Sequence, residues 1–234
     1  MPRLPFSTNQ LKMRLFGVQI LLMMKNKILL VLLCLVPLTS FAQNDDLELW
    51  SSLKFSKKVN SKFKFELQEQ IRWADSLSQY QKNFTELGVK FKAHKSHYLG
   101  INVRFVNEFE QDKYMRINAD LNSDFKLKNS PISFEQRLRI QQSWDALGKL
   151  DKKQLRGKWG IVLKTKFLEP FIAHEVFWKL AETNELSKQR STIGMGWDMI
   201  DKLKMKLFLR SQKQYNRKNP EQVKIIGFGL HYKI

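Results

Sequence analysis

The strongest constraint on the fold is an alternation of apolar and polar residues that recurs in segment after segment from Leu47 to Ile234. Between Phe63 and Trp73, for example, the apolar residues share one register, while Lys, Glu, Gln and Arg fill the other. A period of two places successive side chains on opposite faces of a β-strand, so each strand has one apolar and one polar face. No sustained helical period occurs in this part of the chain. The alternation therefore predicts an all-β fold.

The length of these segments points to a membrane rather than to a water-soluble sheet. Soluble strands have a typical length of about 5 to 6 residues, whereas a tilted strand needs about 9 to 11 to cross the hydrocarbon layer. The connections also alternate between tight and loose, which is typical of periplasmic turns and outer loops. The tight ones are 57–61, 93–96, 128–131, 168–170 and 200–202, and the loose ones are 74–82, 110–113, 145–154, 181–188 and 215–222.

These features predict a transmembrane antiparallel up-and-down β-barrel of about 10–12 strands. Eleven alternating segments can be counted, but bacterial single-chain barrels close with an even number. We therefore expect either ten strands, with Leu47 to Phe55 outside the wall, or twelve. In the segment after Pro170, two registers compete for the outward face.

The last segment has the pattern of a barrel-closing strand. Phe228, Leu230, Tyr232 and Ile234 share one register that runs to the final residue. Outer-membrane barrels end on such a strand, with an aromatic residue two places before the end, although the usual last residue is Phe. We expect this strand to be recognised by the barrel-assembly machinery. An ordinary half-buried strand is the alternative interpretation.

The N-terminal part predicts export. From Met24 a basic start precedes a short apolar run and the small residues Ser40 and Ala42, which is the pattern of a secretory signal peptide over residues 24–42. We expect cleavage between Ala42 and Gln43, a mature barrel over 43–234 and a mis-annotated extension over 1–23. The apolar run is too short for a lasting membrane helix of about 20 residues. The expected location is the outer membrane of a Gram-negative cell.

The cysteine content and the net charge limit the chemistry and the partners that the mature chain can have. The one cysteine, Cys34, lies within the expected signal peptide, so the mature chain offers no disulfide, thiol nucleophile or thiolate ligand. The net charge is +19, and five basic residues precede Gln43, which leaves +14 on the mature part. Export excludes nucleic acid as a partner. A basic envelope protein instead meets outer-membrane lipids with anionic headgroups, or anions in its lumen.

Charged residues of the polar register are expected to face the barrel interior. Charges of both signs in a narrow lumen should pair across it, because unpaired buried charges are costly. We expect these pairs to fill much of the lumen and hold the wall in shape, with a basic pathway or pocket for an anionic solute as the second interpretation. The candidate network consists of Glu66, Arg72, Arg104, Glu108, Arg116, Asp120, Glu135, Arg137, Arg139, Glu175 and Arg210.

Aromatic residues often lie near the ends of the expected strands, which is typical of the two membrane interfaces. Ordinary core packing is the alternative for these rings. The set comprises Trp50, Trp73, Tyr98, Tyr114, Trp144, Trp178, Tyr215 and Tyr232.

Catalysis and metal binding find weak support. Ser96 lies beside His94 and His97, but in a tight turn, and no G-x-S-x-G motif occurs. The spacing of the two histidines aligns ligands on a helix but not in a turn. His174 and Glu175 are neighbours on a strand and point to opposite faces. We expect no catalytic residue, metal or cofactor, and the protein is expected to be non-enzymatic. An outer-membrane lipid hydrolase and a soluble periplasmic β-sandwich remain as alternatives.

Several short motifs carry a resemblance to a known family. They are L-E-L-W-S-S-L-K-F near the mature start, R-L-R-I, L-R-G-K-W-G-I-V, P-F-I-A-H-E-V-F and the closing G-F-G-L-H-Y-K-I. In this layout, residues 46–234 resemble domain-of-unknown-function family 2490, a group of uncharacterised bacterial outer-membrane barrel proteins. The resemblance implies a barrel and an outer-membrane location. It implies no activity, substrate or catalytic residue.

Overall fold

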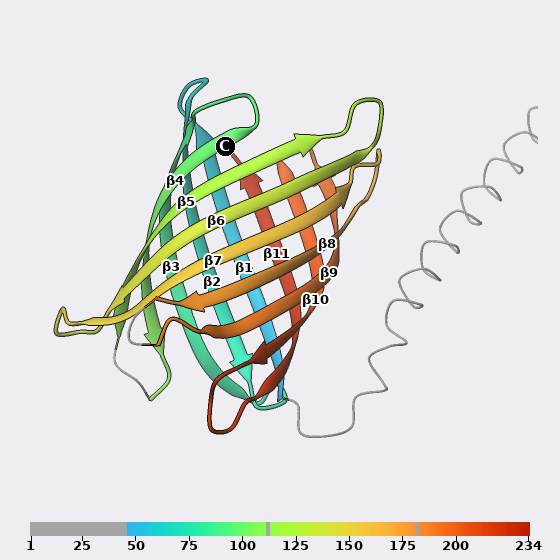
Figure 1. The fold of residues 1–234 in the computed structure, drawn as a ribbon. Helices are drawn as coiled ribbons and strands as arrows, with labels where there is room; N and C mark the ends of the chain where they lie inside the picture. Colours follow the sequence, from blue (N-terminus) through green and yellow to red (C-terminus); the bar gives the residue numbers. More distant parts are fainter. Residues whose placement is uncertain (1–45, 111–112, 181–182) are drawn as a thin grey trace, which may run out of the picture. The chain divides into compact units, whose positions relative to one another are not determined.

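The described part of the chain folds into a closed β-barrel (Figure 1). The structure, a computed structural model, describes residues 46–110, 113–180 and 183–234. Each strand pairs with the next in antiparallel fashion, and β1 closes the barrel against β11. The strands are β1 (Asp46–Lys58), β2 (Phe63–Ala74), β3 (Gln79–Lys92), β4 (His97–Glu108), β5 (Tyr114–Lys126), β6 (Ile132–Trp144), β7 (Leu150–Leu163), β8 (Glu169–Lys179), β9 (Leu186–Ile200), β10 (Leu203–Gln214) and β11 (Gln222–Lys233).

The barrel has eleven strands in the described residues, so the expectation of an even number is wrong. The first segment lies in the wall and pairs on one side with β2 and on the other with β11. In a wall of hairpins, an odd number of strands makes the first and last run in the same direction. The closing pair is therefore parallel, with Asp46 opposite Val223 and Ser56 opposite Lys233. As a result β1 starts at one end of the barrel and β11 finishes at the other (Figure 1).

The two faces of the wall carry opposite chemistry, as the alternation predicts. Large apolar side chains are exposed on the outside, among them Phe65, Ile101 (62% exposed) and Ile193. Polar side chains are buried inside, among them Asn118 (0% exposed) and Gln141. A water-soluble protein shows the reverse distribution. In β8 the competition between registers ends with Ile172 and Trp178 outside and with Glu175 and Phe177 inside, because this choice buries the carboxylate among cations.

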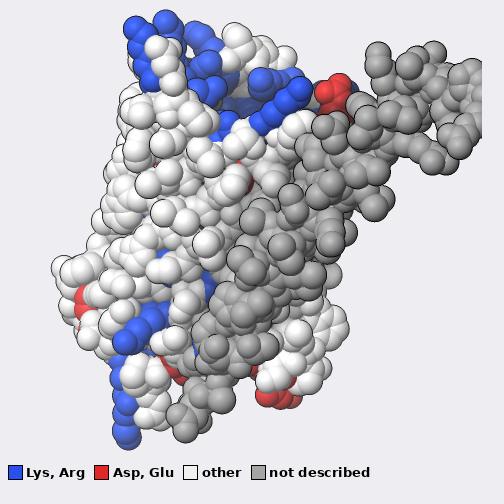
Figure 2. Space-filling model, turned by 90° about the vertical axis from the view of Figure 1, so that its right-hand side faces the viewer, with Lys and Arg blue, Asp and Glu red and all other residues white. Residues whose placement is uncertain are grey.

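The connections differ between the two ends of the barrel, again as the sequence predicts. At the end where β11 finishes, the turns range from the two residues 201–202 to the five residues 127–131, whereas the opposite end includes the seven residues 215–221. Three loops are shorter than predicted, because β3 begins at Gln79, β7 at Leu150 and β9 at Leu186. On the face shown in Figure 2, most of the Lys and Arg side chains gather over the short-turn rim. The turns there contain Lys62, Lys95, Lys128, Lys164, Lys166 and Lys202.

Only some of the aromatic residues predicted near the membrane interfaces lie on the outer wall. Trp73, Trp178 and Tyr232 lie exposed on the outer wall. Trp50 instead points inward and is 4% exposed, because it shares the register of Glu48. It forms a small apolar cluster with Val223 and Ile225, against which Phe208 packs. No helix long and apolar enough to cross a membrane occurs in the described residues.

A glycine allows this inner packing. A Cβ atom on Gly227 would lie 1.9 Å from Cζ of Phe208, so only glycine lets that ring lie flat against β11.

The N-terminal predictions lie outside the described residues. They are the extension (1–23), the signal peptide (24–42) and its cleavage site between Ala42 and Gln43.

Candidate functional site: a cationic cavity inside the barrel

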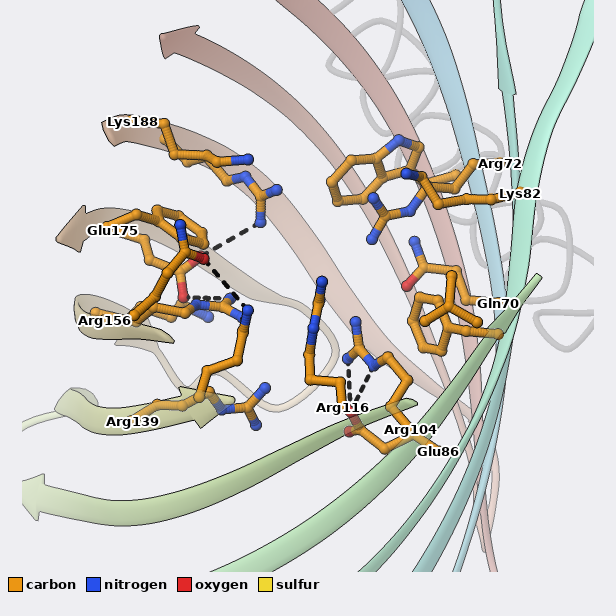
Figure 3. Close-up of a pocket in the computed structure, with 18 of the residues that line it drawn as sticks. Gln70, Arg72, Lys82, Glu86, Arg104, Arg116, Arg139, Arg156, Glu175 and Lys188 are labelled. Atoms are coloured by element: carbon orange, nitrogen blue, oxygen red, sulfur yellow. Dashed lines mark hydrogen bonds and ion pairs between the residues drawn. The ribbon is translucent and has the colours of Figure 1, made fainter. Parts of the chain in front are cut away.

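The barrel encloses a cavity of about 300 Å³ whose lining is strongly cationic. Among the described residues, twelve of the lining side chains are Lys or Arg and two are Glu, a formal excess of ten positive charges. Figure 3 shows Gln70 and Arg72 reaching in from one side and Glu175, Arg156 and Lys188 from the opposite side. The charge excess of the whole chain is thus also present in its interior.

One group of arginines surrounds a carboxylate, and we call it the Glu175 cluster (Glu175, Arg137, Arg156 and Arg190). Oε1 of Glu175 accepts hydrogen bonds from Nη2 of Arg137 at 2.7 Å and from Nη2 of Arg156 at 2.8 Å. Nη1 of Arg190 lies 3.7 Å from Oε2. Strand register brings these groups together, since Glu175 lies opposite Lys158 on β7 and opposite Arg190 on β9. Charge-assisted hydrogen bonds of this kind are stronger than neutral ones.

Two further ion pairs neutralise the neighbouring wall. Asp120 accepts from Nε of Arg139 at 2.5 Å and from Nη2 at 2.6 Å, a two-point contact. Arg104 donates through Nε to Oε2 of Glu86 at 2.7 Å. Each of these arginines is matched by a carboxylate on the adjacent strand. Such pairs need no external anion.

A second group of arginines surrounds an aromatic ring, and we call it the Trp50 cluster (Trp50, Arg72, Arg190 and Arg210). The guanidinium carbons of Arg72, Arg210 and Arg190 lie 3.7, 4.9 and 5.1 Å from the centroid of the Trp50 ring. A cation over the face of an indole is attracted by the ring quadrupole. The ring nevertheless carries no net charge, so it does not neutralise three guanidinium groups.

Carboxylates are scarce around the Trp50 cluster. Within residues 46–110, 113–180 and 183–234, neither Arg72 nor Arg210 has a carboxylate oxygen within 4.0 Å, and Nε of Arg72 is buried without a hydrogen-bond partner. Arg210 donates through Nε to Thr192 Oγ1 at 2.9 Å. The oxygens of Glu48 accept from Trp50 Nε1 at 2.5 Å and from Gln81 Nε2 at 3.0 Å rather than from an arginine. Of the three guanidinium groups only that of Arg190 lies near a carboxylate, Glu175, so the cluster keeps most of its positive charge.

The other candidate network residues lie at several heights of the lumen. Glu66 is surrounded by the ammonium groups of Lys54 and Lys64, each at 2.8 Å, and of Lys90 at 3.2 Å. Glu108 pairs with Lys82. Arg116 donates to Ser143 Oγ at 3.1 Å and to the Tyr114 hydroxyl at 3.2 Å, so its partners are neutral. In the described residues Glu135 has no ion pair, and it is exposed.

The pairing differs from the expected geometry. The ion pairs join adjacent strands, such as β5 and β6 for Asp120 and Arg139, or next-but-one strands, such as β6 and β8 for Arg137 and Glu175. They do not cross the lumen, because a side chain reaches a neighbouring strand more easily than the opposite wall. The centre of the barrel consequently keeps an open cavity.

Sequence reasoning missed several residues of the site, notably Trp50, Glu86, Arg156 and Arg190. Arg156 and Arg190 continue the inward registers of β7 and β9, but each lies just after a predicted loop, 145–154 and 181–188, where the alternation is weak. Extending the period of two backward through Lys158 and Thr192 would have found both. The position of Trp50 near a strand end predicts a membrane-interface ring, because aromatic rings are common there.

Of the residues considered for catalysis or metal binding, His94 and Ser96 lie in the turn between β3 and β4, and His97 and His174 lie on the outer wall. Nδ1 of His97 is 2.9 Å from Oγ of Ser123 on β5, rather than near Ser96, and Nδ1 of His174 is 3.1 Å from Oγ of Ser191. In the described residues no acid or amide hydrogen-bonds to the other nitrogen of either ring, although a catalytic histidine needs such an orienting group. The same part of the chain contains no group of three or more potential metal ligands.

Comparison with known families adds a classification. Residues 47–224 match the family described as "Protein of unknown function (DUF2490)". No curated protein matches the chain.

Proposed function

Since this chain belongs to the DUF2490 family, to which no activity is attached, we propose its function from the barrel itself: it is a non-enzymatic outer-membrane protein that admits or holds small anionic solutes in its lumen. The observation that carries the proposal is the cavity with twelve cationic and two acidic side chains among the described residues. Clefts lined by one sign of charge raise the local concentration of the opposite ion.

The apolar outer face of the barrel and the length of its strands support the membrane location. The strands have 11 to 15 residues, which meets the requirement of about 9 to 11 for crossing the hydrocarbon layer. Exposed apolar side chains cover the outer wall from Phe63 on β2 to Leu207 on β10. In water such a surface would promote association, whereas in a bilayer it is solvated by lipid.

The C-terminal strand supports assembly in the outer membrane. Phe228, Leu230, Tyr232 and Ile234 share a register, and Tyr232 and Ile234 are exposed on the wall. This is the face that we expect the barrel-assembly machinery to recognise. With the short turns on the periplasmic side, as in other barrels, β1 starts on the outer side.

Two experiments test the proposal. The first is membrane fractionation, in which we expect recovery in the outer-membrane fraction and extraction only with detergent. The closed barrel excludes the β-sandwich alternative, and recovery in the periplasmic supernatant without detergent would show instead that the barrel is a water-soluble periplasmic protein. The second is conductance in planar bilayers, in which we expect low current with anion preference. A steady, large cation-selective current would contradict the basic lumen.

A lipid hydrolase is the second candidate, and the contact between His97 and Ser123 favours it over a random surface pair. The two side chains lie 2.9 Å apart on the outward register of β4 and β5 near the short-turn rim, where lipid would be in reach. Phospholipid cleavage by the purified protein, abolished by His97→Ala and by Ser123→Ala, would replace the non-enzymatic proposal. We expect no cleavage above the detergent control.

A further inference from the structure

The Trp50 cluster joins four strands, two from the beginning and two from the end of the barrel sequence. Trp50 lies on β1, Arg72 on β2, Arg190 on β9 and Arg210 on β10, and all three guanidinium carbons lie within 5.1 Å of the centroid of one indole ring. Like charges held this close repel each other, and the repulsion is strong away from bulk water. Glu48 accepts a hydrogen bond from the indole and not from an arginine, and Glu175 reaches Arg190 alone, so in the described residues Arg72 and Arg210 have no carboxylate partner.

The cluster also has unused hydrogen-bonding capacity. A guanidinium group offers five N–H donors. In the described residues, Arg72 has no hydrogen-bond acceptor, and its buried Nε is unsatisfied. Arg210 is bonded to one hydroxyl and Arg190 to Gln212 Oε1 at 2.7 Å. Buried donors without acceptors are costly, so an acceptor-rich anion in the cavity would satisfy several of them at once.

We propose that the Trp50 cluster is a binding site for a compact, multiply charged phosphate. Three converging guanidinium groups favour an anion with at least two negative charges, and their planar forks match phosphate oxygens by two-point contacts. The cavity volume of about 300 Å³ is at the small end of ligand pockets, so the ligand is compact. The inference rests on the proposed function only for the route by which the ligand arrives.

The test is a titration of the purified full chain, folded in detergent, with sodium pyrophosphate at low salt, followed by calorimetry. We expect saturable binding of one pyrophosphate per barrel, and no comparable binding of acetate or chloride. Arg72→Gln and Arg210→Gln each remove charge-assisted bonds, which corresponds to at least about tenfold weaker binding. Absence of saturable binding to the folded wild-type barrel would overturn the site.

Lys54→Gln is the matched control. It also removes one lumen cation, but Lys54 belongs to the group around Glu66, which keeps Lys64 and Lys90. We expect its pyrophosphate affinity to stay within about twofold of the wild type. Equal weakening in Lys54→Gln and Arg72→Gln would show that only the overall charge matters, and it would overturn the site.

Tryptophan fluorescence gives a second readout that does not need the arginine variants. Pyrophosphate is expected to change the emission of the wild-type barrel, and Trp50→Phe is expected to abolish that change. A change that persists in Trp50→Phe would place the anion elsewhere. Heat-modifiable mobility on gels would show that each variant is folded before it is titrated.

Phosphate could reach the cavity on a free solute or on a lipid headgroup, and a second titration separates the two. If monomeric dihexanoyl phosphatidic acid binds more tightly than pyrophosphate and responds to Arg72→Gln, the source is a lipid, and otherwise it is a solute. Anion-selective conductance without pyrophosphate binding would remove the site and keep the proposed function. If the protein binds pyrophosphate in detergent but is not recovered in the outer-membrane fraction, the site is kept and the proposed function is removed.

Discussion

The Glu175 cluster and the Trp50 cluster are two groups of three arginines that share Arg190, yet they differ in what lies at the centre. Around Glu175 the arginines donate hydrogen bonds to a carboxylate, at 2.7 and 2.8 Å for Arg137 and Arg156. Around Trp50 they lie near a ring that lacks charge. Glu175 neutralises part of the charge of the first group, whereas the ring neutralises none of the charge of the second. The charge of the central group, rather than the number of arginines, distinguishes the two clusters.

Glu175→Gln should have the largest effect, because it converts the first cluster into an uncompensated one. Breaking a buried ion pair by removing one partner costs about 3 to 5 kcal/mol. We expect the free energy of unfolding in lipid or detergent, measured with urea, to fall by an amount in this range. Glu135→Gln is the control, since Glu135 is exposed, and no loss is expected. Equal stability of both variants would mean that the Glu175 cluster is hydrated.

Gly227→Ala should perturb the second cluster through its packing. The new Cβ would lie 1.9 Å from Cζ of Phe208, whose ring has the Arg210 guanidinium 4.6 Å from its centroid. Overpacking of this kind costs about 1 to 3 kcal/mol. Gly229→Ala is the matched control, because its Cβ would approach Ser52 Oγ at 3.0 Å and no ring. Urea unfolding should show a larger loss of the free energy of unfolding for Gly227→Ala than for Gly229→Ala. Equal losses would contradict the close packing of the Phe208 ring on Gly227.

Arg72→Met and Arg156→Met compare the clusters directly. Arg156→Met removes a hydrogen-bonded partner of Glu175 and should destabilise the barrel by about 1 to 3 kcal/mol. Arg72→Met relieves repulsion between cations, so the free energy of unfolding should stay within about 0.5 kcal/mol or rise. Both variants lose one lumen charge, and both should reduce anion preference in bilayers. If Arg72→Met loses more stability than Arg156→Met, the Trp50 cluster rather than the Glu175 cluster stabilises the barrel.

Single cysteines should change stability least and would show which side of the membrane the Trp50 cluster faces. Trp50 lies near the start of β1 and Arg72 near the end of β2, at the end that carries the loop 75–78. We expect a membrane-impermeant maleimide to label Ser76→Cys on intact cells and to label Ser61→Cys, in the opposite turn, only after lysis. The reverse pattern would place the short turns outside.

Much of the fold could be predicted from the sequence, because apolar and polar residues alternate along each strand and so indicate which face is outside and which is inside. The register of β2, with Phe65 outside and Glu66 inside, follows from the period of two alone. The start of β9 is harder to assign, because Lys188 and Arg190 alternate with polar residues, so only the register extended back from Ile193 places them inside. The eleven strands fall within the predicted range of about 10–12, but the expectation of an even number is wrong, since closure depends on how the chain ends meet and not on any local pattern.

The sequence by itself determined that this chain has an apolar outer face and an ionic inner face, because hydrophobicity alternates residue by residue. Only the tertiary structure decided that β1 closes against β11 in parallel and that Trp50 points inward among arginines. Closure pairs β1 with β11, which places β2 and β1 on one side of the seam and β11, β10 and β9 on the other, with residues more than a hundred positions apart in the chain. Contacts of that range depend on strand number and stagger, which no local period encodes, and the cationic site exists because of them.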